Sequence, residues 1–102
     1  MITAVVKQPG AVAAPQEIDG GVESIQALVG GYFEAHRLTG GYTVWCNEQG
    51  TKYMAPNIID ECHGAVLVGT VVVTRGDNGL TARDVPRVVG LLNRLSVLGS
   101  LV

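Results

Sequence analysis

The sequence predicts a small α+β domain, in which a mainly antiparallel sheet is packed by a short helix from its N-terminal half and by a C-terminal helix. Its 102 residues, 47% of them hydrophobic, suffice for one domain with one core. Fourteen glycines separate short runs of alternating or continuous apolar residues, which is typical of strands joined by turns. Two other segments carry apolar residues at helical spacing instead.

The N-terminal part is predicted to hold one strand and one helix. Residues 1–8 form the strand, and residues 11–15 follow as a loose connector. Residues 17–31 form the helix, with Asp19 as its N-cap, because a carboxylate there can accept from the free N–H groups of the first turn. Gly30-Gly31 would end it. The helix would bury one apolar face, formed by Val22, Ile25, Leu28 and Val29.

The middle of the chain is predicted to hold a β-hairpin followed by a loop. Residues 32–38 and 42–47 alternate in polarity and flank Thr39-Gly40-Gly41, so we expect them to pair. Residues 53–64 are predicted to be a loop with a short turn of helix. Pro56 lacks a backbone N–H and would interrupt a central strand there.

The last third is predicted to form one long strand and one helix. Residues 65–75 are nearly all apolar and rich in valine, which indicates a central strand covered on both faces. The turn GDNG follows it. Thr81 and Asp84 resemble a capping box, but Pro86 must lie in the first turn, so the helix should start near Arg83 or Asp84. Its apolar side would be formed by Val85, Val88, Val89, Leu92 and Leu95.

Charge and composition argue against several classes of partner. The net charge is −2, and residues 16–61 hold most of the acidic side chains. The arginines of the last predicted helix are too few for the dense basic face that nucleic acid requires. No segment approaches the roughly 20 apolar residues of a membrane span. Two cysteines and no basic, signal-like start favour reduced thiols in a cytoplasmic protein.

The heptapeptide IIDECHG, residues 58–64, resembles the acidic motif of a helicase ATPase. A phosphate-binding loop of the form GxxxxGK[ST] is missing, and 102 residues cannot supply two motor domains. We therefore predict a connector, in which Ile58 and Ile59 anchor the loop to the core while Asp60, Glu61 and His63 face water.

The chain is also predicted to lack a metal site, a cofactor and a catalytic residue. The possible metal ligands are Cys46, Cys62, His36 and His63, with Asp60 or Glu61, yet neither CxxC nor HxxxH spacing occurs. Adjacent residues such as Cys62 and His63 rarely converge on one ion. The same pair is not by itself a nucleophile and a base, because those partners must meet in space.

The predicted hairpin places a cluster of aromatic and basic residues on two strands, consisting of His36, Arg37, Tyr42 and Trp45. Such a cluster could bind a partner or a planar ligand, and could equally be half core and half solvated strand.

Several short pieces occur in a fixed order, namely LVGGY.E, NE.G, PN and VG..VV, and together they cover roughly residues 17–94. They resemble domain-of-unknown-function family 3846, whose small domains occur mostly in phages and other mobile elements, and in some actinobacterial and clostridial genomes. The remaining residues, 95–102, form an apolar tail. The resemblance implies a source in a phage or an integrated element and a place in the bacterial cytoplasm. It implies no activity.

The sequence thus favours a non-enzymatic accessory protein that binds a host protein, perturbing host growth or defence. The residues expected to contact this partner are Trp45, Leu95 and Leu98. The alternative is a small-ligand or nucleotide-binding module with a pocket formed by Glu34, Arg37, Asn47, Glu48 and Asn57. An enzyme would need a pocket with convergent titratable groups. We also expect self-association, with a symmetric dimer closed by the apolar helix and tail.

Overall fold

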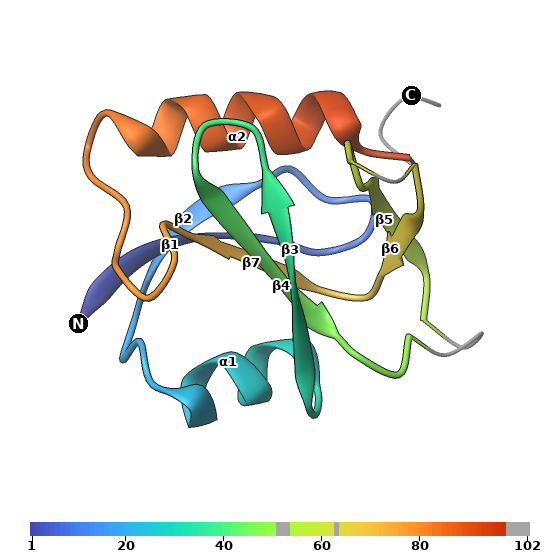
Figure 1. Cartoon of the computed structure of the whole chain (residues 1–102), viewed down its shortest axis with the longest axis horizontal. Helices are drawn as coiled ribbons and strands as arrows, with labels where there is room; N and C mark the ends of the chain where they lie inside the picture. Colours follow the sequence, from blue (N-terminus) through green and yellow to red (C-terminus); the bar gives the residue numbers. More distant parts are fainter. Residues whose placement is uncertain (51–53, 63, 98–102) are drawn as a thin grey trace.

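A computed structural model describes residues 1–50, 54–62 and 64–97, and it confirms the predicted α+β fold (Figure 1). The strands are β1 (Ile2–Lys7), β2 (Ala14–Ile18), β3 (Phe33–Leu38), β4 (Tyr42–Asn47), β5 (Pro56–Ile59), β6 (Val66–Val68) and β7 (Val71–Thr74). The helices are α1 (Val22–Val29) and α2 (Asp84–Leu95). No helix in this part of the chain is long and apolar enough to cross a membrane.

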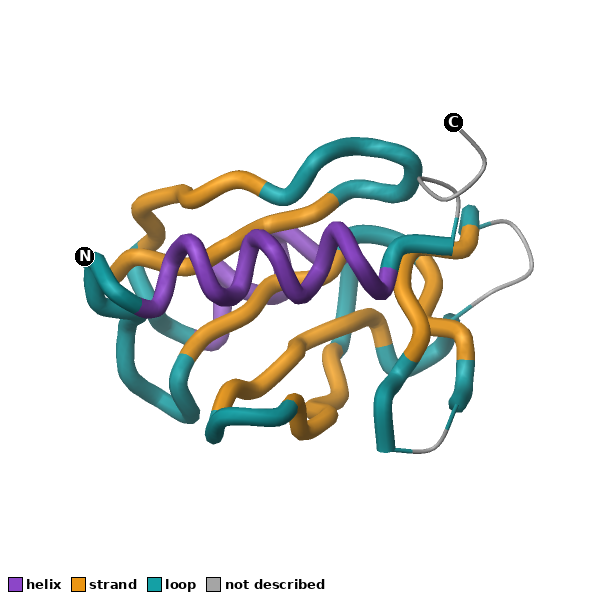
Figure 2. The backbone as a smooth tube through the Cα atoms, turned by 90° about the horizontal axis from the view of Figure 1, so that it is seen from above, coloured by secondary structure: helices purple, strands orange, loops and turns teal. Residues whose placement is uncertain are grey.

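The main sheet lies between the two helices, as Figures 1 and 2 show. Its five strands are antiparallel to their neighbours, in the order β2-β1-β7-β4-β3. Because successive side chains of a strand point to opposite faces, each face needs its own apolar cover. On one face, α2 packs Val88, Leu91 and Leu92 against the sheet. On the other, α1 contributes Ile25 and Val29.

The N-terminal helix is shorter than the sequence predicts. Ala14 and Pro15, expected in a connector, begin β2, and Glu17 and Ile18 end that strand instead of starting a helix. The helix starts at Val22 with Gly21 as its N-cap, so Asp19 does not cap it. Pairing with β1 places Ile18 in the core opposite Ile2, a tertiary contact that outweighs local helix preference.

The valine-rich segment is two strands rather than one. β6 pairs with β5 in a separate hairpin, and only β7 lies in the centre of the main sheet. The break falls at Gly69, which has a φ of +76°, and a Cβ there would lie 3.1 Å from the Met54 sulfur. Only glycine adopts this conformation without strain. The predicted loop around Pro56 is therefore wrong: Pro56 starts β5, at the end of a two-stranded sheet where its missing N–H is tolerated.

The start of α2 agrees with the sequence. The helix begins at Asp84, and Pro86 lies in its first turn. The Thr81 N–H donates to Asp84 Oδ2 at 2.8 Å, and the Asp84 N–H points back to Thr81 Oγ1 at 3.3 Å. These reciprocal contacts are those of a capping box.

Candidate functional site

The β3–β4 hairpin is the platform of the candidate site. Its turn pairs Leu38 with Tyr42, and the antiparallel register then places Glu34 directly opposite Cys46. His36 lies two residues after Glu34, so both side chains point to the same face of the sheet. The predicted hairpin is confirmed, and it brings a carboxylate, an imidazole and a thiol together.

His36 lies at the centre of this cluster. Its Nδ1 is 3.1 Å from Oδ2 of Asp60, and its Nε2 is 3.3 Å from Oε1 of Glu34. In a neutral imidazole only one nitrogen carries a proton, and the shorter contact to Asp60 assigns that proton to Nδ1, because an ionised carboxylate can only accept. The Nε2 atom is buried and makes no hydrogen bond to any described residue. The Cys46 thiol lies 3.9 Å from the same Glu34 oxygen.

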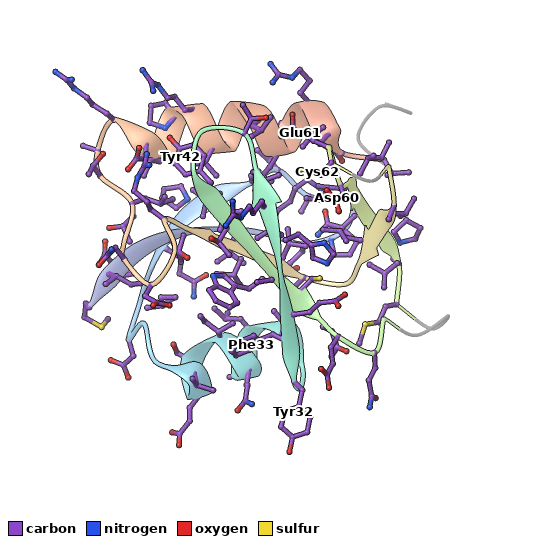
Figure 3. The ribbon with its side chains drawn as sticks, in the orientation of Figure 1. Tyr32, Phe33, Tyr42, Asp60, Glu61 and Cys62 are labelled. Atoms are coloured by element: carbon purple, nitrogen blue, oxygen red, sulfur yellow. The ribbon has the colours of Figure 1, made fainter. Side chains whose placement is uncertain are left out.

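Asp60 reaches the cluster from the IIDECHG segment, where the sequence predicts a solvent-facing side chain. It is instead 2% exposed, whereas Glu61 and Cys62 are exposed. The Cys62 N–H donates to Asp60 Oδ1 at 2.9 Å, which fixes the carboxylate. Figure 3 shows Asp60 beside the β3–β4 hairpin, on the connection that leaves β5. Ile58 is buried as predicted, but Ile59 is 41% exposed because it alternates with Ile58.

Burial and negative charge make the thiolate form of Cys46 unfavourable. Burial raises the pKa of the thiol, and the nearby carboxylates of Glu34 and Asp60 raise it further, to about 11. The same two carboxylates flank His36. A cation placed among these groups would offset the repulsion between them.

The residues predicted to form a ligand pocket lie at separate positions. Asn57 is fully buried between strands. The amide of Asn47 donates to the Val29 carbonyl at the end of α1. Glu48 is exposed and bonded to Tyr32 through its backbone N–H. Arg37 is exposed and points away from the face that carries Glu34, which joins the cluster around His36.

The predicted partner residues are divided between interior and surface. Trp45 is half-buried, packs edge-to-face on Phe33 with a centroid distance of 5.0 Å, and donates its indole N–H to Thr74. Leu95 is half-buried and packs on the core beneath α2. Leu98 lies outside the described residues.

Two surface grooves are lined by residues other than those of the cluster. One, of about 340 Å³, runs between β2 and α1 and is lined by Met1, Gln16, Glu17, Ile18, Asp19, Ser24, Ala27 and Leu28. The other, of about 270 Å³, lies between the β3–β4 turn and α2 and is lined by Thr39, Gly40, Tyr42, Glu61, Arg87, Leu91 and Arg94. The second groove therefore carries two guanidinium groups and an aromatic ring.

The cluster around His36 was partly readable from the sequence. Once the turn at Thr39-Gly40-Gly41 pairs Leu38 with Tyr42, counting back along the hairpin pairs Glu34 with Cys46. No local pattern points to Asp60, because its approach to His36 depends on how the β5–β6 hairpin packs against the β3–β4 hairpin.

Comparison with known proteins identifies a family for this chain. The model of a domain of unknown function, DUF3846, matches residues 2–92, so the match also covers β1 and the start of β2, which precede the span of the short pieces. No curated protein matches the chain, and no solved structure does. Because the match covers nearly the whole chain, the protein belongs to the DUF3846 family.

Proposed function

We propose that this protein is a small accessory protein of a phage or other mobile element, which acts without catalysis by binding a host protein in the bacterial cytoplasm. The source and the compartment rest on the family resemblance. The observation that supports binding is the groove between β2 and α1, next to an exposed sheet edge.

The β2 edge offers backbone groups to an incoming strand. β2 is the outermost strand, it pairs on one side with β1, and no other described strand pairs with it. Four of its five residues are exposed. An extended peptide can add to such an edge through main-chain hydrogen bonds, while a neighbouring groove takes its side chains.

The lining of the groove between β2 and α1 favours one kind of partner peptide. Its floor contains Ile18 and Leu28, and Met1 at its border is 82% exposed. Glu17 and Asp19 line it, and Glu23 lies in the first turn of α1. The partner segment should therefore be extended and should combine apolar side chains with lysine or arginine.

Ala27→Arg tests this mode of binding. Ala27 is exposed on α1 and lines the groove, so an arginine there fills it and repels a basic segment without touching the core. We expect a host protein that the wild-type chain captures from lysate to be lost, measured by quantitative mass spectrometry of the captured proteins.

The matched control is Ala82→Arg, which adds the same charge at an exposed position outside the groove. Capture by the wild type and this control, together with loss in Ala27→Arg and relief of any growth effect in the host, supports the proposal. Absence of a specific partner and of any effect on growth would count against it. Equal capture by all three proteins would show that the groove is not the binding surface.

A second candidate function, nucleotide binding, is favoured by the groove beside α2. Arg87 and Arg94 could hold phosphate oxygens, and the Tyr42 ring lies in the same groove. A nucleotide at about 100 times its Kd would stabilise the fold by about 2.7 kcal/mol, visible as a rise in melting temperature. Arg87→Gln should remove this rise, whereas Arg83→Gln, at an exposed position outside the groove, should keep it. No shift with any nucleotide would contradict this candidate.

Self-association stays a prediction, and one of the two surfaces that suggested it, the apolar face of α2, is already covered. The apolar face of α2 covers its own sheet, so it is not free to close a dimer. Light scattering on the full chain and on a chain ending at Leu95 tests whether the last residues contribute.

A further inference from the structure

We propose that Glu34, His36 and Cys46 form a zinc-binding site, in which Asp60 orients the imidazole and solvent completes the coordination. This inference goes beyond the proposed binding of a host protein and does not depend on it. Its basis is the convergence of a carboxylate, an imidazole and a thiol, in which the imidazole Nε2 is buried and makes no hydrogen bond to any described residue.

The spacing of the ligand atoms fits a tetrahedral ion. The three atoms all lie within 4.8 Å of one another. His36 Nε2 and Glu34 Oε1 are 3.3 Å apart, and Cys46 Sγ is 3.9 Å from that oxygen. Zinc bound to nitrogen, oxygen and sulfur at usual lengths holds such atoms about 3.3–3.6 Å apart. Atoms up to 4.8 Å apart reach this range when the side chains close by about 1.2 Å.

The position of Asp60 supports a ligand role for His36. A metal-binding histidine usually donates its second ring N–H to a carboxylate, which fixes the tautomer and aims the free nitrogen at the metal. Asp60 Oδ2 lies 3.1 Å from Nδ1, and its other oxygen accepts from the Cys62 N–H. The lone pair of Nε2 then faces Glu34 and Cys46, where no described residue donates to it.

The ligand set selects zinc over harder cations. A thiolate and an imidazole suit Zn²⁺, whereas Mg²⁺ and Ca²⁺ require oxygen ligands. Cys46 is 2% exposed, and the Glu34 side chain is 49% exposed. The cluster is thus closed on the thiol side and open to solvent beside Glu34, as a site with three protein ligands and one water requires. Binding converts the Cys46 thiol to a zinc-bound thiolate and releases its proton to solvent.

Titration of the full chain with metal tests the site. Protein treated with a chelator and kept reduced should bind one Zn²⁺ per chain in calorimetry. Co²⁺ in its place should give a thiolate-to-cobalt charge-transfer band. We expect Cys46→Ser to abolish the band. His36→Gln and Glu34→Gln should weaken Zn²⁺ binding by more than the roughly 10–100-fold expected for Asp60→Asn.

Cys62→Ser is the matched control, because Cys62 is the other thiol and is exposed. It should keep both the band and the affinity. Circular dichroism of each variant separates loss of metal from loss of fold, and Glu34→Gln keeps the test decisive because Glu34 is half-exposed. The proposal is overturned if the wild type binds no Zn²⁺, because His36 would then be an ion-paired histidine and not a metal ligand. It is also overturned if Cys62→Ser removes the band.

Discussion

Asn57→Ala should lower the free energy of unfolding by about 3–5 kcal/mol, a large part of the 5–15 kcal/mol typical of a small domain. The Asn57 oxygen accepts from the Lys7 ammonium at 2.6 Å, and its NH₂ group donates to the carbonyls of Lys7 and Gly69, both at 2.8 Å. Lys7 is 1% exposed, and burial lowers the pKa of its ammonium group. Removing the amide leaves a buried cation and two carbonyls without these contacts.

Urea unfolding of three further variants separates the contributions. Asn57→Asp keeps an acceptor for Lys7 but turns carboxylate oxygens toward two carbonyls, so it should also destabilise the fold. Asn57→Ala should cost less in a Lys7→Met background, because no buried charge is then left unpaired. Asn93→Ala removes one part-buried hydrogen bond, which Asn93 accepts from the Ala13 N–H, and should cost about 1 kcal/mol. If Asn57→Ala costs no more than Asn93→Ala, the amide is not a structural link.

The Asn57 result also bears on function. A loss of ligand or partner binding in an Asn57 variant would be interpretable only after its fold had been checked. Variants of Glu48 and Arg37 test binding more directly, because these exposed side chains can be replaced at little cost in stability.

Asp84→Asn should destabilise the protein at neutral pH and have a progressively smaller effect in acid. Arg75 donates to Asp84 Oδ1 at 2.7 Å, and Tyr42 donates to the same oxygen at 2.9 Å. Thr81 donates to Oδ2 through its N–H and its hydroxyl. The ion-paired Arg75 first, and then the Thr81 N–H, hold the pKa of Asp84 well below the usual carboxyl range.

The sign of the pH dependence follows from this lowered pKa. An Asp whose pKa is lower in the folded state stabilises the fold at every pH above its unfolded value of about 3.9. That contribution disappears as the pH falls below 3.9 toward the folded pKa. The stability difference between wild type and Asp84→Asn should therefore be constant above about pH 5 and should shrink below pH 4.

Urea unfolding of both proteins across this pH range measures the difference. Asp77→Asn, in an exposed turn, serves as the control and should follow the wild type. A difference that stays constant down to low pH would show that the Asp84 charge is not responsible. Asp84 also affects the groove beside α2, because Tyr42 lines that groove and its hydroxyl donates to Asp84. Arg75 holds the same ring from above, with its guanidinium carbon 4.7 Å from the Tyr42 ring centroid.

The sequence by itself determined the features that depend on neighbours along the chain. Alternation and the turn Thr39-Gly40-Gly41 specified the β3–β4 hairpin, and Gly30, with a φ of +82°, ended α1 as predicted. Pro86 placed the start of α2 at Asp84. These signals are local, because they reflect the conformations that single residues allow and the period of one element.

Only the tertiary structure decided where distant segments meet. Residues 17 and 18 became part of a strand because β1 was available to pair with them, and the valine-rich run was divided at Gly69 because its halves join different sheets. Asn57 reached Lys7, and Asp60 reached His36, across 50 and 24 positions of the chain. Buried polar groups need partners wherever the fold provides them, so their roles depend on packing that no local pattern records.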